Sequence, residues 1–138
     1  MLRRNPPPDG QNPEFFSDRA LGRRVYEALE LDGWTVHPMF KVWPRSENKR
    51  IDDETWIPTV AEWGWVILSK DEFDKPHERD LLRDHGARAF SIFNQKLKVE
   101  QMVERFLNNK ERILQFTGQA GPYLYAVQPS DLRKIPLG

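Results

Sequence analysis

The run Trp65-Val66-Ile67-Leu68-Ser69-Lys70-Asp71 constrains the fold more than any other stretch of the chain. Its first four residues are apolar without alternation, Gly64 precedes them and polar residues follow. A strand that is apolar on both faces is typical of a parallel sheet covered by helices. Ligands of open parallel sheets bind beyond the carboxyl ends of the strands. We therefore expect Ser69, Lys70 and Asp71 where an active site would form.

The rest of the chain alternates between strand and helix signals. Periodic apolar positions, caps and glycine stops predict strands over 15–17, 34–37, 65–69 and 87–92, and helices over 21–31, 54–63, 78–84 and 99–114. Pro58 suggests that the second helix begins late. Residues 123–127 and 132–135 are expected to form a hairpin or an added edge. This alternation predicts a three-layer α/β/α sandwich with a central, mainly parallel sheet.

Length and composition set the domain organisation. A chain of 138 residues suits one domain, which we place over 14–138. Residues 1–13 hold four of the eleven prolines and are interpreted as a flexible lead-in. The sequence has no apolar run of membrane-spanning length and no secretory signal, so we expect a cytoplasmic protein without a membrane partner. The absence of cysteine excludes disulfides, thiolate metal sites and a cysteine nucleophile.

The net charge of zero hides a segregation of charge along the chain. Residues 51–86 carry ten acidic and four basic side chains, whereas the segments on either side are net positive. An acidic centre with a basic rim suits a divalent metal at the centre and a phosphate backbone at the edge. Blocks of charge are also an ordinary feature of a highly charged surface.

Three aspartates occupy equivalent places in this predicted sheet. Asp18 follows the first strand, Asp53 begins a helix, and Asp71 follows the central strand. Clustered carboxylates require a cation, and their hard oxygen atoms favour Mg²⁺ or Mn²⁺. Such a metal polarises a phosphoryl oxygen and activates water for phosphodiester hydrolysis. Aspartates at these places also serve as caps and turn formers, which is the competing interpretation.

Four motifs in fixed order strengthen the metal interpretation. They are Phe15-Phe16-Ser17-Asp18-Arg19-Ala20-Leu21-Gly22, Gly33-Trp34-Thr35-Val36-His37, Asp53-Glu54-Thr55-Trp56-Ile57-Pro58, and Glu62 through Asp71. Together they resemble the short PIN-like domains of VapC-type toxins, and the resemblance extends over about residues 14–135. It implies a PIN fold and a Mg²⁺- or Mn²⁺-dependent ribonuclease, often the toxin of a toxin–antitoxin pair. RNA, a cognate antitoxin and a second copy of the chain are the implied partners.

The resemblance also implies roles for individual residues. Asp18 and Asp71 would bind the metal directly, and Asp53 would complete the site or reach the metal through water. A fourth acid would be Glu78 or Asp74, or would be absent, and Glu78 is alternatively a helix-capping acid. Lys70 and Arg19 are the candidate substrate-binding residues.

Other interpretations remain open from the sequence. Ser69 stands where the family usually has threonine, and the segment after Asp71 is short, so a catalytically inactive PIN-like binding module is one alternative. Another Rossmann-like phosphate-ester hydrolase is a second. His37 is interpreted as structural. Most tryptophans are expected in the core, with Trp43 as the candidate for contact with RNA or a partner.

Overall fold

The computed structural model describes residues 13–44 and 51–138. Within these ranges one six-stranded sheet has the order β2-β1-β3-β4-β5-β6. The strands are β1 (Phe15–Ser17), β2 (Val36–Pro38), β3 (Val66–Ser69), β4 (Arg88–Ser91), β5 (Tyr123–Val127) and β6 (Leu132–Ile135). Strands β1 to β5 are parallel to their neighbours, and β6 runs antiparallel to β5. The predicted mainly parallel sheet is confirmed.

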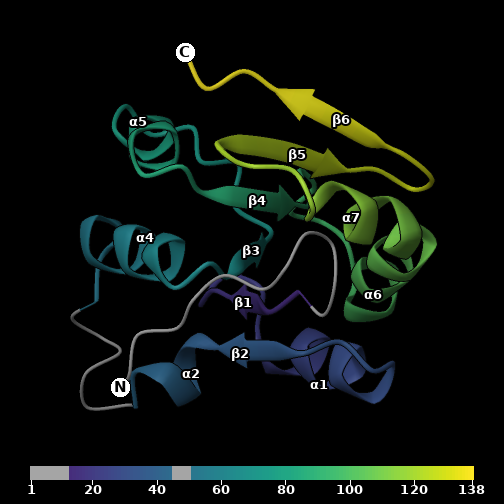
Figure 1. Ribbon diagram of the computed structural model, residues 1–138. Coiled ribbons are helices and arrows are strands. Elements are labelled where there is room, and N and C mark those ends of the chain that lie inside the picture. Colours follow the sequence, from purple (N-terminus) through teal and green to yellow (C-terminus); the bar gives the residue numbers. More distant parts are fainter. Residues whose placement is uncertain (1–12, 45–50) are drawn as a thin grey trace.

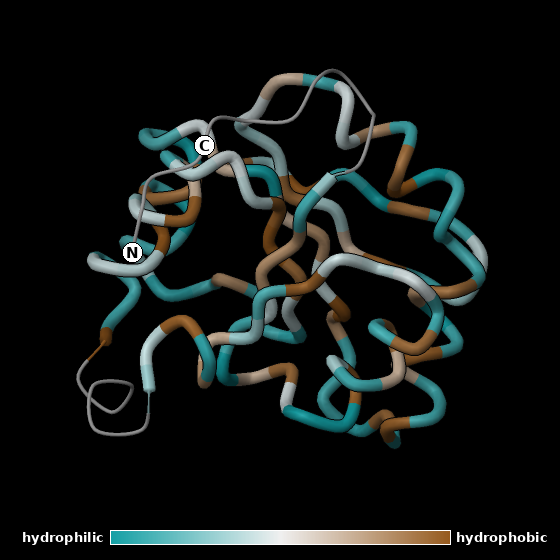
Figure 2. The backbone as a smooth tube through the Cα atoms, turned by 60° about the horizontal axis from the view of Figure 1, so that its bottom comes forward, coloured by the Kyte–Doolittle hydropathy of each residue, from teal (hydrophilic) through white to brown (hydrophobic). Residues whose placement is uncertain are grey.

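Helices cover both faces of this sheet (Figure 1). Helices α1 (Arg23–Leu31), α6 (Val99–Asn108) and α7 (Lys110–Phe116) pack on one face, and α4 (Asp53–Glu62) and α5 (Glu78–Asp84) pack on the other. The short α2 (Met39–Val42) follows β2 at the end of the sheet. In Figure 2 brown, hydrophobic stretches run through the middle of the molecule, and brown alternates with teal on the outer segments. The predicted three-layer sandwich is therefore confirmed.

Strand β3 connects the two hydrophobic cores. It lies between β1 and β4, and all four of its residues are fully buried. Val66 and Leu68 point into the core under α1 and α6, whereas Ile67 points into the core under α4 and α5. Burial on both faces explains why its sequence is continuously apolar rather than alternating.

Helix α4 begins earlier than the sequence suggested. The Asp52 side chain accepts hydrogen bonds from the Thr55 backbone N–H at 3.1 Å and from the Thr55 hydroxyl at 2.8 Å, which starts the helix at Asp53. Pro58 lies inside the helix, where its ring removes one backbone N–H. The expectation of a late start is wrong because this cap stabilises the first turn.

The predicted long helix over 99–114 is two helices, α6 and α7, which meet at Asn109. Asn109 is fully buried, and its side-chain amide donates to the Arg105 carbonyl at 2.9 Å and to the Gln128 carbonyl at 2.8 Å. These bonds join the break to the end of β5. The apolar periodicity continues through both helices, so it could not reveal the break. The tail forms a β5–β6 hairpin that also adds an edge to the sheet.

Most of the predicted lead-in, residues 1–12, lies outside the described residues. The proposal that 14–138 form one domain stays a prediction. Across the part of the chain that the structure describes, the helices are too short or too polar to cross a membrane.

Arg88, the first residue of β4, offers a test of the contacts that hold the amino ends of the strands. Its guanidinium donates to the Thr117 carbonyl at 2.5 Å and to the Gly64 carbonyl at 2.7 Å. We expect Arg88→Met to lower the free energy of unfolding by about 2–3 kcal/mol, because two carbonyl groups lose a charged donor. Arg24→Met is the control, since Arg24 is 72% exposed and its ion pair with Glu100 is long, at 3.8 Å. Equal urea midpoints for the two variants would contradict this assignment.

Candidate functional site

Five acidic residues gather where the parallel strands end. Asp18 directly follows β1, Asp71 and Asp74 lie in the segment after β3, Asp53 is the first residue of α4, and Glu78 is the first residue of α5. Crossover helices start at the edge where parallel strands finish, so both kinds of position meet there. Burial is the main cause that raises the pKa of Asp18, and the charges of Asp71 and Asp53 add to the rise, so the three predicted aspartates lie near one another.

Asp18 is one of two buried acids in this group, with 8% of its surface exposed. Its carboxylate accepts hydrogen bonds from the Ser69 hydroxyl at 2.5 Å and from the Leu21 backbone N–H at 3.2 Å. Burial raises the pKa of Asp18 to about 7, and these hydrogen bonds oppose the rise. At neutral pH without a cation, Asp18 therefore shares its population between the protonated and ionised forms.

The Ser69 side chain joins Asp18 to the segment that carries Asp71. The same hydroxyl that donates to Asp18 accepts the Asp71 backbone N–H at 2.9 Å. The Asp71 carbonyl accepts the Ser91 hydroxyl at 2.6 Å, and the Lys70 carbonyl accepts the Gln95 side-chain amide at 2.5 Å. Ser69 of β3, Ser91 at the end of β4 and Gln95 in the loop after it thus hold the backbone on both sides of Asp71.

Phe73 holds the turn after Asp71 in a strained conformation. Its φ is 52°, in the left-handed region that costs a non-glycine residue about 1–2 kcal/mol. The buried Phe73 ring, the bond from the Phe73 N–H to Asp71 at 2.9 Å and the bond from Arg79 to the Phe73 carbonyl at 3.0 Å maintain it. Arg79 also donates to the Glu72 carbonyl at 3.2 Å. The left-handed backbone at Phe73 thus sets the path of the loop that carries Asp71 and Asp74.

Asp53 and Glu78 form a second pair of acids at the starts of α4 and α5. The Glu78 carboxyl is almost fully buried and accepts the Lys75 backbone N–H at 3.0 Å. Burial comes first among the causes that raise the pKa of Glu78 to about 7, followed by its hydrogen bond with Asp53 and the charge of Asp71. Asp53 is further held by the Trp56 indole N–H at 2.9 Å. Glu78 therefore caps the turn before α5 and also faces the other acids.

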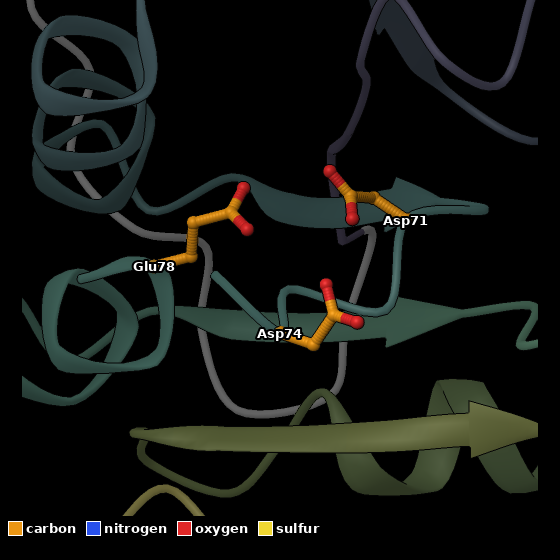
Figure 3. A group of neighbouring side chains, drawn as sticks. All are labelled: Asp71, Asp74 and Glu78. Atoms are coloured by element: carbon orange, nitrogen blue, oxygen red, sulfur yellow. The ribbon is translucent and has the colours of Figure 1, made fainter. Parts of the chain in front are cut away.

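Asp71, Asp74 and Glu78 each offer an oxygen atom within 4.8 Å of the others. Figure 3 shows the three carboxylates turned toward the same space, with Asp74 contributed by the loop between β3 and α5. Asp74 is exposed, whereas Glu78 is buried. The donor set consists of hard carboxylate oxygen atoms, which suit a divalent cation such as Mg²⁺ or Mn²⁺.

The remaining predicted residues have more varied surroundings. Arg19 is exposed and donates to the Ile51 carbonyl at 3.2 Å, which connects the end of β1 to the entrance of α4. The Lys70 side chain is partly exposed beside Asp71. His37 pairs with Glu14 at 2.8 Å and stacks on Trp65 at 3.9 Å between ring centroids, in keeping with the structural interpretation.

Trp43 is a poorer candidate for RNA contact than the sequence suggested. It is partly buried against the core under α4, where it stacks on Trp63 at 6.2 Å and meets Phe16 edge-on at 6.0 Å. Its basic neighbours at 45–50 lie outside the described residues.

Sequence reasoning missed Ser91, Gln95 and Arg79, which hold the backbone around Asp71. Ser91 and Gln95 are 20 and 25 residues from their partners in the sequence. They contact backbone carbonyl groups, so no pairing of residue types signals the contact. The available clue was their position at the end of a predicted parallel strand next to β3.

Comparison with known proteins gives two matches. The family model described as "PIN like domain" matches residues 13–94, which is more than half of the chain. The chain is also similar to a Mycobacterium tuberculosis protein named "Putative ribonuclease VapC45", with 28% identity over 124 residues, covering 88% of this chain and 90% of that protein. No solved structure matched.

The raised pKa values predict an unusual dependence of stability on pH. The pKa values of Asp18 and Glu78 rise from 3.8 and 4.5 to about 7, so the folded state binds these protons more tightly than the unfolded state does. In EDTA their contribution to the free energy of unfolding should fall as the pH rises from about 4 to about 7, and stay constant above. Asp18→Asn should flatten this decline.

Urea unfolding at pH 4.5, 6 and 7.5 measures this effect. The control is Asp131→Asn, because Asp131 is exposed in the β5–β6 turn. A decline that is as steep in Asp18→Asn as in the unaltered protein would show that Asp18 does not bind the proton.

Proposed function

Because the chain belongs to the PIN-like domain family, we propose that it is a metal-dependent endoribonuclease that hydrolyses phosphodiester bonds in RNA. The observation that carries this proposal is the gathering of five carboxylates at the carboxyl edge of a parallel sheet, two of them with a pKa raised to about 7. Such an arrangement is costly without a cation, so its presence favours a site built for one.

Asp18 and Asp71 are the proposed direct metal ligands. Ser69 bonds to both residues and holds them together. Asp53 and Glu78 lie beside them and would complete the site, directly or through water. When bound, Mg²⁺ or Mn²⁺ would polarise the scissile phosphoryl oxygen and lower the pKa of a water molecule. Lys70, which is next to Asp71 in the sequence and partly exposed, would contact a phosphate.

Partners and location form the less direct part of the proposal. The chain's motifs resemble those of VapC-type toxins, and the similar Mycobacterium tuberculosis protein is named "Putative ribonuclease VapC45". We therefore propose that the protein is the toxin of a toxin–antitoxin pair, acts on RNA in the cytoplasm and is held by a cognate antitoxin. A homodimer is the proposed assembly, and sedimentation of the purified protein tests it.

Cleavage of RNA tests the catalytic proposal. The unaltered protein should cut a fluorescent single-stranded RNA when Mn²⁺ is added. Asp71→Asn and Asp18→Asn should each lower the rate at least a hundredfold, because each removes a charge from the cation site. Asp131→Asn is the matched control and should keep full activity. Cleavage that persists unchanged in Asp71→Asn would overturn the proposal.

Other results of the same experiment identify the alternative functions. A protein that binds RNA without cutting it, and shows no calorimetric heat with Mn²⁺, is a catalytically inactive binding module. A protein that turns over a small phosphate ester faster than RNA is a different Rossmann-like hydrolase.

Glu78 and Asp74 differ in burial, which predicts which of them serves as the fourth acid. Glu78 is 1% exposed and bonded to Asp53, whereas Asp74 projects from an exposed loop position. We expect Glu78→Gln to weaken Mn²⁺ binding about tenfold or more and Asp74→Asn to weaken it much less. Isothermal titration at pH 7.5 measures both affinities. A larger loss in Asp74→Asn would reverse the assignment.

A further inference from the structure

We propose that single-stranded RNA runs from the acidic centre along a basic and aromatic strip formed by Lys70, Lys96, Phe93 and Arg133, and that Phe93 and Arg133 bind one of its bases. This strip crosses the carboxyl edge of the sheet from β3 to β6. The inference rests on the proposed function, and it adds the direction in which the substrate lies and the residues that contact it away from the metal.

The register of the strands places Arg133 level with the acidic centre. Ser69 of β3 pairs with Ser91 of β4, Ser91 pairs with Ala126 of β5, and Ala126 pairs with Arg133 of β6. Three strand spacings separate Ser69 from Arg133, or about 14 Å. The strip therefore begins at the proposed cation site and ends about 14 Å from it, a distance that a short single-stranded RNA can span.

The same register places Arg133 on the α5 side of the sheet. Paired residues in neighbouring strands point to one face, and Ala126 belongs to the core under α4 and α5. Ile135, two residues further along β6, lies in that core as well. The face of the sheet that carries Arg133 is thus the one on which α5 presents Glu78.

The loop after β4 connects the acidic centre with Arg133. At one end Gln95 donates to the Lys70 carbonyl at 2.5 Å, which places the neighbouring, exposed Lys96 close to the main chain beside Asp71. At the other end the Arg133 guanidinium lies 6.0 Å from the centroid of the Phe93 ring. One short loop therefore carries a cation next to the site and an aromatic ring next to a second cation.

Phe93 and Arg133 have the chemistry of a base-binding pair. Phe93 is only partly buried, and Arg133 is exposed although it extends over an aromatic ring. Proteins bind single-stranded nucleic acids through a positive groove along the backbone and flat aromatic or guanidinium groups on which bases stack. An acidic peptide would use the cations of the strip but has no need of the ring, so the pair favours a nucleic acid.

Lys134 provides a matched control for Arg133. It is the next residue of β6, is exposed and carries the same charge. It pairs with Tyr125, whose side chain packs against the core under α1 and α6, so Lys134 points to the opposite face. Removing either charge changes the net charge equally, and only the position of the charge differs.

The experiment measures cleavage and binding of a fluorescent single-stranded RNA. Arg133→Gln and Phe93→Leu should each raise KM about tenfold with kcat nearly unchanged, because both residues lie away from the reacting phosphate. Lys134→Gln should leave both constants unaltered. Phe93→Leu should lose its effect on an RNA with abasic positions, whereas Arg133→Gln should keep part of its effect through the phosphates. Equal KM values for Arg133→Gln and Lys134→Gln would overturn the inference.

Binding measurements separate this inference from the proposed function. Fluorescence anisotropy with the Asp71→Asn variant measures RNA affinity without cleavage. If the unaltered protein fails to cut RNA but Arg133→Gln weakens its binding about tenfold, the strip stands and the catalytic proposal fails. If the protein cuts RNA and neither strip variant changes KM or affinity, the catalytic proposal stands and the strip is wrong.

Discussion

The hydrogen bonds of one buried hydroxyl group, that of Ser69, organise the centre of this molecule. The hydroxyl donates to Asp18 at the end of β1 and accepts the backbone N–H of Asp71 at the exit of β3. Both partners therefore lie at fixed positions relative to the same strand. Ser69 can do this because β3 is buried on both faces and cannot shift without exposing its side chains in two cores. The positions of Asp18 and Asp71 thus depend on the hydrophobic packing around β3.

The acidic cluster opposes this packing. Burial and mutual repulsion raise the pKa values of Asp18 and Glu78, so the fold keeps two carboxyl groups where their ionisation is unfavourable. Strain adds to this at Phe73, whose left-handed backbone is maintained by a buried ring and by Arg79. Unfavourable terms gathered in one place, in an otherwise well-packed domain, are typical of functional sites. A bound cation would relieve the electrostatic part.

Local patterns predicted most of the fold because each depends on neighbouring residues. The buried run of β3, the helix over Glu78–Asp84 and the hairpin at the end of the chain follow from periodicity and turn signals. The break at Asn109 did not, because it is stabilised by a bond to Gln128 that no local pattern encodes. The start of α4 was misjudged for a different reason, since the cap at Asp52 outweighs the proline within the helix.

The candidate site shows the same division between local and distant determinants. Asp18, Asp53 and Asp71 were predictable because strand ends and helix starts meet at one edge of a parallel sheet. Glu78 was ambiguous, since its sequence position fits a helix cap, and it does accept the Lys75 N–H while also contacting Asp53. The end of β4 and the loop after it could not be recognised from the sequence as part of the site, because Ser91 and Gln95 donate to backbone carbonyl groups. Yet this loop joins the acidic centre to a partly buried aromatic ring and an exposed cation. A centre fixed by buried hydrogen bonds and a rim left open to solvent are complementary requirements for cutting a polymer, since the bond to be broken must be held still while the chain on either side remains free to enter and leave.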